Sequence, residues 1–187
     1  MKCATLAFLS VLLMSCDAET DSRPMTIDTP EGKVNTTVKT VDLADQRVVV
    51  ANPAELLRLR SSAAKASEFA AIVVPEASAV DLKVLDEAFR RWQERRSTAF
   101  TQEQVVEMLG AALGEKMVAD LDMEWVVVSD QFGTDYGVRS RKSEVMAFPF
   151  SSVQKRVGRN EYDFLIGIYH SVQSLIESGE SRPQQRE

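Results

Sequence analysis

The sequence predicts a single α+β domain in which helices are followed by a three-stranded antiparallel meander and a C-terminal helix. Three observations lead to this prediction. Apolar residues recur at helical spacing over residues 80–97 and 101–121, a β-branched run followed by turn residues occupies residues 123–141, and helical spacing returns over residues 161–177. Residues 34–178 are numerous enough to bury about two-thirds of their unfolded surface, so one core is expected.

Composition excludes several classes of protein. The chain has 187 residues, with 22 Lys+Arg against 28 Asp+Glu, two cysteines and one histidine. These values rule out a collagen-like chain and a disulfide scaffold, and the net negative charge argues against a nucleic-acid partner. A single histidine leaves little material for His-based metal sites or catalytic triads, so no metal and no cofactor are expected.

The first sixteen residues have the layout of a secretory leader. Met1-Lys2 supplies one positive charge, and residues 4–14 form an apolar run. A transmembrane helix needs about twenty apolar residues, so this run is too short to cross a bilayer. The run ends in Leu13-Met14-Ser15-Cys16, which resembles the lipobox of bacterial lipoproteins.

The lipobox resemblance implies that residues 1–15 are a signal peptide removed after Ser15 and that Cys16 then carries a diacylglycerol. An ordinary cleaved signal peptide and a buried apolar N-terminal helix are the alternatives. Cys3 would leave with the leader, so the mature domain would contain no free thiol. In enteric bacteria an aspartate in the place of Asp17 is similar to a signal for retention at the inner membrane. We therefore expect a lipid-anchored protein on the periplasmic face of the cell envelope, at the inner membrane or alternatively the outer one.

Two polar segments flank the expected domain. Residues 16–33 contain two prolines and five acidic residues, a composition that buries little apolar surface and predicts a flexible tether behind the lipidated cysteine. Residues 179–187 are also polar and are expected to form a disordered tail.

The first elements of the domain are two strands and a helix. Polar and apolar residues alternate over residues 34–40, and Arg47–Ala51 is a second candidate strand. Asn52-Pro53 is expected to cap and open a helix that continues to about Ala71. Residues 72–74 either extend this helix or form a short strand, which Pro75 would end.

Two further helices follow. The first is expected over about 80–97, with an apolar face made by Leu82, Leu85, Phe89 and Trp92. Thr101 and Gln104 form a capping box that starts the second, which is expected to reach Leu121. Gly110 and Gly114 lie one turn apart in it, at a cost of about 1 kcal/mol each in helix propensity. We therefore expect a neighbouring element to approach the helix closely at these glycines.

The meander and the last helices complete the domain. Strands are expected at Met123–Ser129, Tyr136–Arg141 and Glu144–Phe148, with turn residues between the first two. A capping box at Ser151–Gln154 predicts a short helix closed by Gly158. The C-terminal helix, over about 161–177, is expected to bury Leu165, Ile168, Tyr169, Val172, Leu175 and Ile176.

Residues from about 80 to 160 resemble an uncharacterised bacterial family that is classed only as a domain of unknown function. The resemblance is carried by Glu124-Trp125-Val126-Val127-Val128, Asp130, Phe132-Gly133-Thr134-Asp135, Val138-Arg139 and Phe148-Pro149, with Leu109-Gly110, Gly114-Glu115 and Lys155-Arg156 on either side. It implies a bacterial origin and an α+β fold, and it supplies no activity.

The acidic residues and the histidine fit turn and surface positions better than a functional site. Asp130, Gly133 and Asp135 suit a hairpin turn better than a metal site, because an EF-hand needs more oxygen ligands than this segment has. Other carboxylates, Glu124, Glu144, Glu161 and Asp163 among them, fit surface positions, and His170 lies off the apolar stripe of its helix. No nucleophile elbow accompanies the serines. The sequence therefore predicts no catalytic residue.

Positive charge is concentrated in residues 136–160, where six basic side chains accompany one acid, Glu144. The six are Arg139, Arg141, Lys142, Lys155, Arg156 and Arg159. On an otherwise acidic chain they form a candidate binding site for an anionic envelope component or an acidic partner, and separate exposure in solvent is the alternative.

The sequence therefore favours a membrane-anchored, non-enzymatic binding module that contacts a protein or an anionic envelope component. A carboxylate- and arginine-dependent envelope hydrolase or modifying enzyme is one alternative, and a structural spacer is another. A cleft with two buried carboxylates of raised pKa would favour the enzyme.

Overall fold

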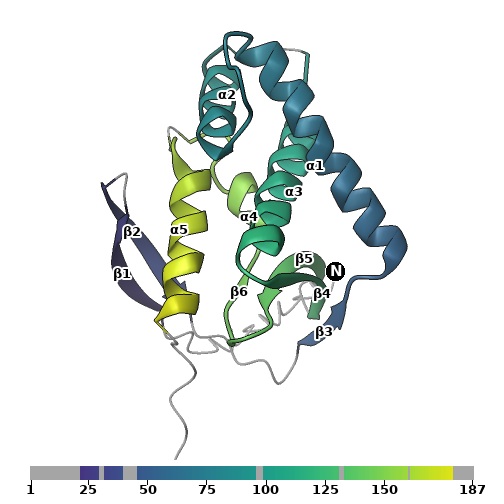
Figure 1. Ribbon diagram of the computed structural model, residues 1–187, viewed down its shortest axis with the longest axis vertical. Helices are drawn as coiled ribbons and strands as arrows, with labels where there is room; N and C mark the ends of the chain where they lie inside the picture. Colours follow the sequence, from purple (N-terminus) through teal and green to yellow (C-terminus); the bar gives the residue numbers. More distant parts are fainter. Residues whose placement is uncertain are drawn as a thin grey trace, which may run out of the picture.

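The computed structural model describes residues 22–29, 32–39, 46–95, 99–130, 133–159 and 161–178. They form an α+β domain with one hydrophobic core (Figure 1). In chain order, the elements are β1 (Ser22–Thr29), β2 (Gly32–Lys39), β3 (Arg47–Val50), α1 (Pro53–Val73), α2 (Leu82–Arg95), α3 (Gln102–Asp120), β4 (Met123–Asp130), β5 (Gly133–Ser140), β6 (Met146–Ala147), α4 (Pro149–Gln154) and α5 (Phe164–Glu177).

The predicted α+β class is confirmed, with one strand more in the sheet than expected. The sheet is antiparallel, in the order β3-β4-β5-β6. β3 joins the meander because its backbone pairs with β4 from Arg47↔Ser129 to Val50↔Val126. β6 is only two residues long, since the Ser140 hydroxyl accepts the backbone N–H groups of Lys142 and Ser143 and holds the chain in a turn.

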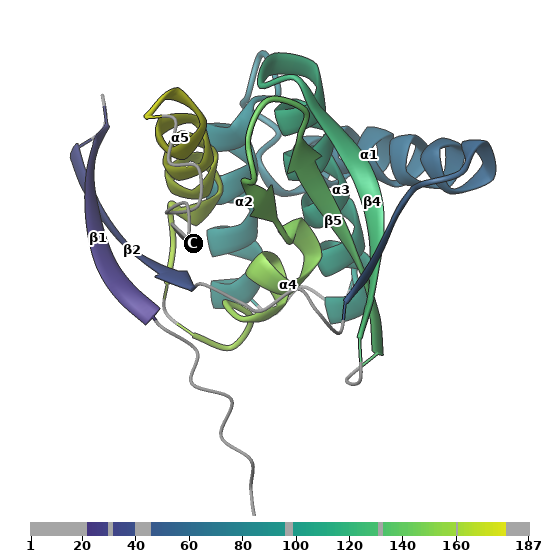
Figure 2. The same cartoon turned by 90° about the horizontal axis from the view of Figure 1, so that it is seen from below.

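β1 and β2 form a separate antiparallel pair over their whole length, from Ser22↔Lys39 to Thr29↔Gly32. This pair lies beside α5, as both views of the ribbon show (Figures 1 and 2). The structure here differs from the flexible tether predicted over residues 16–33. A lone strand at residues 34–40 would leave the backbone groups of both its edges unpaired, and pairing with β1 satisfies those of one edge. The other tether residues, the leader with Cys16, and the tail 179–187 lie outside the described residues.

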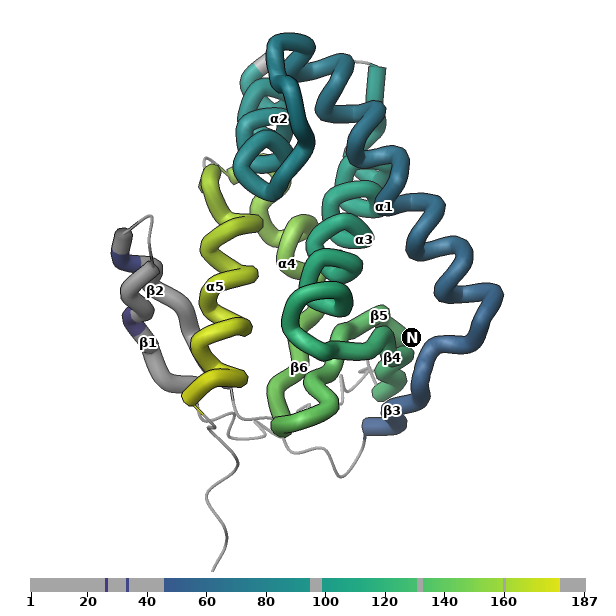
Figure 3. The backbone as a smooth tube through the Cα atoms, in the orientation of Figure 1, coloured from purple at the N-terminus to yellow at the C-terminus, as the bar shows by residue number. Residues whose placement is uncertain are grey.

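α1 and α3 pack side by side, and α3 covers one face of the sheet (Figure 3). The predicted cap of α1 is confirmed, because the Asn52 side chain accepts the N–H groups of Ala54 and Glu55. α1 continues through Val73, so residues 72–73 extend the helix and do not form a strand. The predicted capping box of α3 is also present, with Gln104 N–H donating to the Thr101 hydroxyl at 3.3 Å.

The predicted close approach to α3 at Gly110 and Gly114 is confirmed, and the groups that approach are aromatic rings. A Cβ added at Gly114 would overlap the Trp125 indole of β4, and one added at Gly110 would lie 2.6 Å from Phe150 Cδ1. Both rings therefore reach the α3 backbone because these positions carry no side chain. The two contacts set the distance of α3 from β4 and from α4.

The predicted capping box at Ser151–Gln154 is wrong. α4 begins two residues earlier, at Pro149, and has no side-chain cap. Proline at the first turn has its φ fixed for a helix and no N–H to satisfy, so it can start α4 without a cap. The prediction that Gly158 closes this segment agrees with its φ of 74°.

The last helix begins at Phe164 and buries Leu165 and Val172 as expected, while the other four predicted core positions are half-buried. Among the described residues, no helix combines the length and the apolar character that crossing a membrane requires.

Candidate functional site

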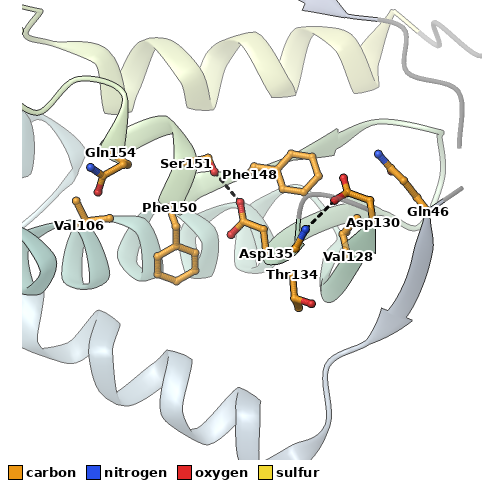
Figure 4. A pocket seen from close by; sticks show the side chains of 11 residues that line it. Gln46, Val106, Val128, Asp130, Thr134, Asp135, Phe148, Phe150, Ser151 and Gln154 are labelled. Atoms are coloured by element: carbon orange, nitrogen blue, oxygen red, sulfur yellow. Dashed lines mark hydrogen bonds between the residues drawn. The ribbon is translucent and has the colours of Figure 1, made fainter. Parts of the chain in front are cut away.

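An open hollow of about 480 Å³ lies where the end of the β4–β5 hairpin meets α4, and Figure 4 shows its side chains. Its volume falls within the range of small-molecule binding sites. The described lining residues are Gln46, Val106, Val128, Asp130, Gly133, Thr134, Asp135, Phe148, Phe150, Ser151 and Gln154.

Sheet register places the two carboxylates of the hollow on one face. Asp130 pairs with Gly133, and Val128 pairs with Asp135, so all four residues lie on the same face. Asp130 and Asp135 are diagonal neighbours, and such neighbours have a separation of about 7–8 Å. The hairpin therefore presents two carboxylates to the same hollow from diagonal positions.

Asp135 is held in place by α4. Its Oδ2 accepts a hydrogen bond from the Ser151 hydroxyl at 2.6 Å, and its Oδ1 accepts the Tyr136 N–H at 2.8 Å (Figure 4). Sequence reasoning assigned Asp135 to the turn and Ser151 to a helix cap. Both assignments are wrong, because β5 begins at Gly133 and the Ser151 hydroxyl reaches across to the strand.

Asp130, in contrast, has the predicted role in the turn. Its Oδ1 accepts the Gly133 N–H at 3.1 Å, and Gly133 has a φ of 140°, which favours glycine. No group of three or more potential metal ligands is present in the described part of the chain.

The two phenylalanines of the hollow differ in their surroundings. Phe150 packs against the rings of Trp125 and Tyr136, with centroid distances of 5.9 and 6.2 Å, and so belongs to the core. Phe148 is half-buried and is not among the residues packed on the core. Its ring lies against β5 at Gly137, where an added Cβ would be 3.4 Å from Phe148 Cε1. Phe148 therefore contributes an aromatic surface to the hollow itself.

A smaller cavity of about 130 Å³ lies on the other side of Asp135 and Phe150. Its polar groups are satisfied within the protein. The Tyr136 hydroxyl donates to Glu55 Oε1 at 3.3 Å, and the Ser62 hydroxyl donates to Glu107 Oε1 at 2.7 Å. Arg58 lies over the Tyr136 ring. These bonds link α1 to the sheet and to α3, which gives this cavity a structural role.

The six basic residues of the predicted anion site fall into two groups. At one end of β4–β5, Arg139 and Arg141 pair with Glu124 at 2.6 and 3.7 Å, and Lys142 pairs with Asp122 at 3.0 Å. These acids neutralise much of the positive charge of the first group.

The second group follows α4. Arg156 and Arg159 approach Glu161 at 3.8 and 3.7 Å, and Lys155 is exposed. Arg156 also lies 4.9 Å from the centroid of Phe164, and burial lowers its pKa from the ordinary value. Arg156 thus has a packing role, and a test of anion binding is better made at Arg141, Lys142, Lys155 and Arg159.

One carboxyl group with a raised pKa lies away from the hollow. Asp86 of α2 is 1% exposed and accepts the N–H groups of Leu165 and Ile166, at 2.9 and 3.2 Å. Burial raises its pKa to about 6, and these two hydrogen bonds act in the opposite direction. Asp86 therefore stabilises the start of α5 and takes no part in the candidate site.

The described chemistry of the hollow is suited to binding. Ser151 donates to a carboxylate, and the only histidine of the chain, His170, is on α5 next to Gln173. No imidazole stands beside the serine as a general base. Sequence reasoning missed Phe148 and the Asp135–Ser151 bond, because each depends on how β5 and α4 pack.

Comparison with known proteins gives one match. A search of curated proteins and a search of solved structures each find nothing similar to the chain. Ten of the eleven lining residues of the hollow lie between residues 81 and 169, the only exception being Gln46. Residues 81–169 match the model of an uncharacterised protein family, described as a domain of unknown function (DUF3806).

Proposed function

We propose that this protein is a membrane-anchored lipoprotein of the cell envelope and that its globular domain is a non-enzymatic binding module. The hollow beside Asp135 and Phe148 is its binding site. One observation supports this role above the others: Ser151 fixes Asp135 next to an aromatic ring that the core does not use. Fixed polar groups beside an apolar surface are typical of ligand sites.

The anchor in this proposal is Cys16. Each buried methylene contributes about 0.8 kcal/mol, and two or more acyl chains hold a protein stably on a membrane. A diacylglycerol on the sulfur would therefore keep the domain at the periplasmic surface, with the inner membrane favoured by Asp17. The binding partner would then be a protein or another component of the envelope.

Charge separates two surfaces of the module. The described lining of the hollow contains two carboxylates and no basic side chain, so it disfavours an anionic ligand. An anionic envelope component would instead meet the two basic groups, of which Lys142 and Arg159 are more than half exposed.

Thiol labelling tests the proposed site in the envelope. If Cys16 is acylated and Cys3 has been removed, the mature protein has no free thiol, so a cysteine introduced at exposed Gln154 reports on the hollow alone. We expect a small maleimide to label Gln154→Cys several-fold more slowly in intact envelopes than in purified protein, because an envelope ligand covers it.

Ser67→Cys, at an exposed position on α1, is the matched control and should label at the same rate in both preparations. Equal rates in the two preparations for Gln154→Cys as well as for Ser67→Cys would argue against a ligand in the hollow. Labelling of the parent chain would show a free Cys16.

A further inference from the structure

We infer that the hollow binds the neutral ring of a saccharide, with Phe148 as the surface on which the ring stacks and with Asp130 and Asp135 accepting its hydroxyl groups. This inference rests on the proposed binding function and names the ligand class.

The hydrogen-bonding groups of the hollow are mixed in kind. Gln46 and Gln154 carry carboxamides, and the two aspartates carry only acceptors when ionised. The Ser151 hydroxyl already donates to Asp135, and the Thr134 hydroxyl is bonded to Ser129 on the other face of the hairpin. A sugar hydroxyl both donates and accepts, so a saccharide ring can bond both to the carboxamides and to the carboxylates. A simple ammonium ion, which only donates, would leave the donor groups of the lining unused.

The placement of the two carboxylates suits a ring that carries several hydroxyls. Asp130 and Asp135 are diagonal neighbours on one face of the hairpin, and the Cα atoms of such neighbours lie about 7–8 Å apart. A pyranose ring carries hydroxyls on opposite sides, and it can therefore approach Asp130 with one and Asp135 with another.

Phe148 supplies the apolar part of the site. Phe148 directly follows β6, and by register it lies opposite Gly137 of β5. Gly137 and Asp135 are two residues apart on the same face of β5, so Phe148 lies on the face that carries Asp135. The Phe148 ring packs next to Gly137, where an added Cβ would be in van der Waals contact with the ring at 3.4 Å and closer to the Ala147 carbonyl oxygen at 3.2 Å. The C–H groups on one face of a sugar can pack on such a ring while its hydroxyls reach the aspartates.

Asp135 is ready for this role before a ligand arrives. Ser151 and the Tyr136 backbone each donate one hydrogen bond to it, and a carboxylate oxygen can accept a second. These bonds fix the orientation of the carboxylate, which lowers the entropy lost on binding. Ser151 is therefore a positioning residue for Asp135.

The test is a titration of the full purified protein, followed through the backbone NMR signals of residues 133–137 and 148–154. The probes are the neutral disaccharides cellobiose and N,N′-diacetylchitobiose, with lysine amide as a cationic probe and inorganic phosphate as an anionic one. We expect shifts at these residues with at least one disaccharide and none with phosphate.

Variants assign the binding to named side chains. Phe148→Leu and Asp135→Asn should each weaken disaccharide binding about tenfold, the ratio that corresponds to the loss of about one hydrogen bond or ring contact. Phe148→Tyr keeps the aromatic face and should bind within about twofold of the parent. Glu144→Gln removes an exposed carboxylate elsewhere and is the matched control for Asp135→Asn, with no change expected.

Three outcomes would overturn the inference: shifts with lysine amide and with neither disaccharide, equal disaccharide binding by Phe148→Leu and the parent, or no shift with any probe. Retained thiol protection of Gln154→Cys in the envelope would then leave the binding site standing with a different ligand. Loss of that protection would remove the proposed function itself.

Discussion

Replacing Gly114 by alanine is expected to lower the free energy of unfolding by about 3 kcal/mol, at the upper end of the usual cost of overpacking a core. The added Cβ would overlap the six-membered ring of the Trp125 indole. Trp125 is 2% exposed, and its Nε1 donates to Glu115 Oε1 at 2.8 Å, so the ring cannot move aside without losing that bond. The better helix propensity of alanine, about 1 kcal/mol, compensates only in part. Chemical denaturation of the purified protein measures the loss.

A double-mutant cycle identifies the cause of this loss. Trp125→Phe shortens the side chain, so Gly114→Ala should cost at least 1 kcal/mol less in the Trp125→Phe background than in the parent, a coupling of the size seen between contacting residues. An equal cost in the two backgrounds would show that the loss does not arise from the contact between Gly114 and Trp125.

Replacing Asp86 by alanine is the second change with a large expected effect, also a loss of about 3 kcal/mol. The α5 helix lacks a cap of its own, since Asp163 makes no capping hydrogen bond, and Asp86 of α2 accepts the Leu165 and Ile166 N–H groups instead. Each buried N–H left without an acceptor costs about 1–3 kcal/mol. Chemical denaturation measures the total, and hydrogen exchange at Leu165 and Ile166 shows whether the start of α5 opens.

Asp163→Asn is the control for this experiment. Asp163 is exposed with a φ of 57°, which asparagine also tolerates, so this variant should stay within about 0.5 kcal/mol of the parent. A loss for Asp86→Ala that does not exceed the loss for Asp163→Asn would contradict the role assigned to Asp86.

Asp86 also predicts how stability depends on pH. Burial raises its pKa from 3.8 to about 6, so between these values the native protein holds a proton that the unfolded chain has released. The contribution of Asp86 to the free energy of unfolding therefore falls as the pH rises through this window. Asp86→Asn should remove this contribution, so the melting temperature of the parent should fall relative to that of Asp86→Asn as the pH rises from 4 to about 6. Parallel curves for the parent and Asp86→Asn would show that another group titrates.

Local sequence signals predicted the helices well. Asn52 and Thr101 carry cap chemistry that acts within one turn, and the glycines at 110 and 114 indicated a close approach before the partners were known. The partners themselves, Phe150 and Trp125, come from elements that meet α3 only in the folded chain. Sequence patterns could therefore place the contact on α3 without saying what fills it.

The strands and the site were less predictable, because their partners are distant in sequence. β3 reads as an isolated candidate strand, and only its pairing with β4 adds it to the sheet. Ser151 has the local pattern of a capping box, yet its hydroxyl donates to Asp135 on another element. The six basic residues are close in sequence, but they fall into two groups that pair with different acids. One group meets Glu124 of β4, and the other meets Glu161 in the segment before α5.

The proposed function depends most on Cys16, because a lipid on that sulfur places the domain at the membrane where it would meet an envelope ligand. Intact-mass spectrometry of the protein purified from its native membrane tests this directly. We predict a chain that begins at Cys16 and carries the mass of a diacylglycerol. A chain that still begins at Met1, or a free thiol at Cys16, would contradict the proposed anchor and the location that follows from it.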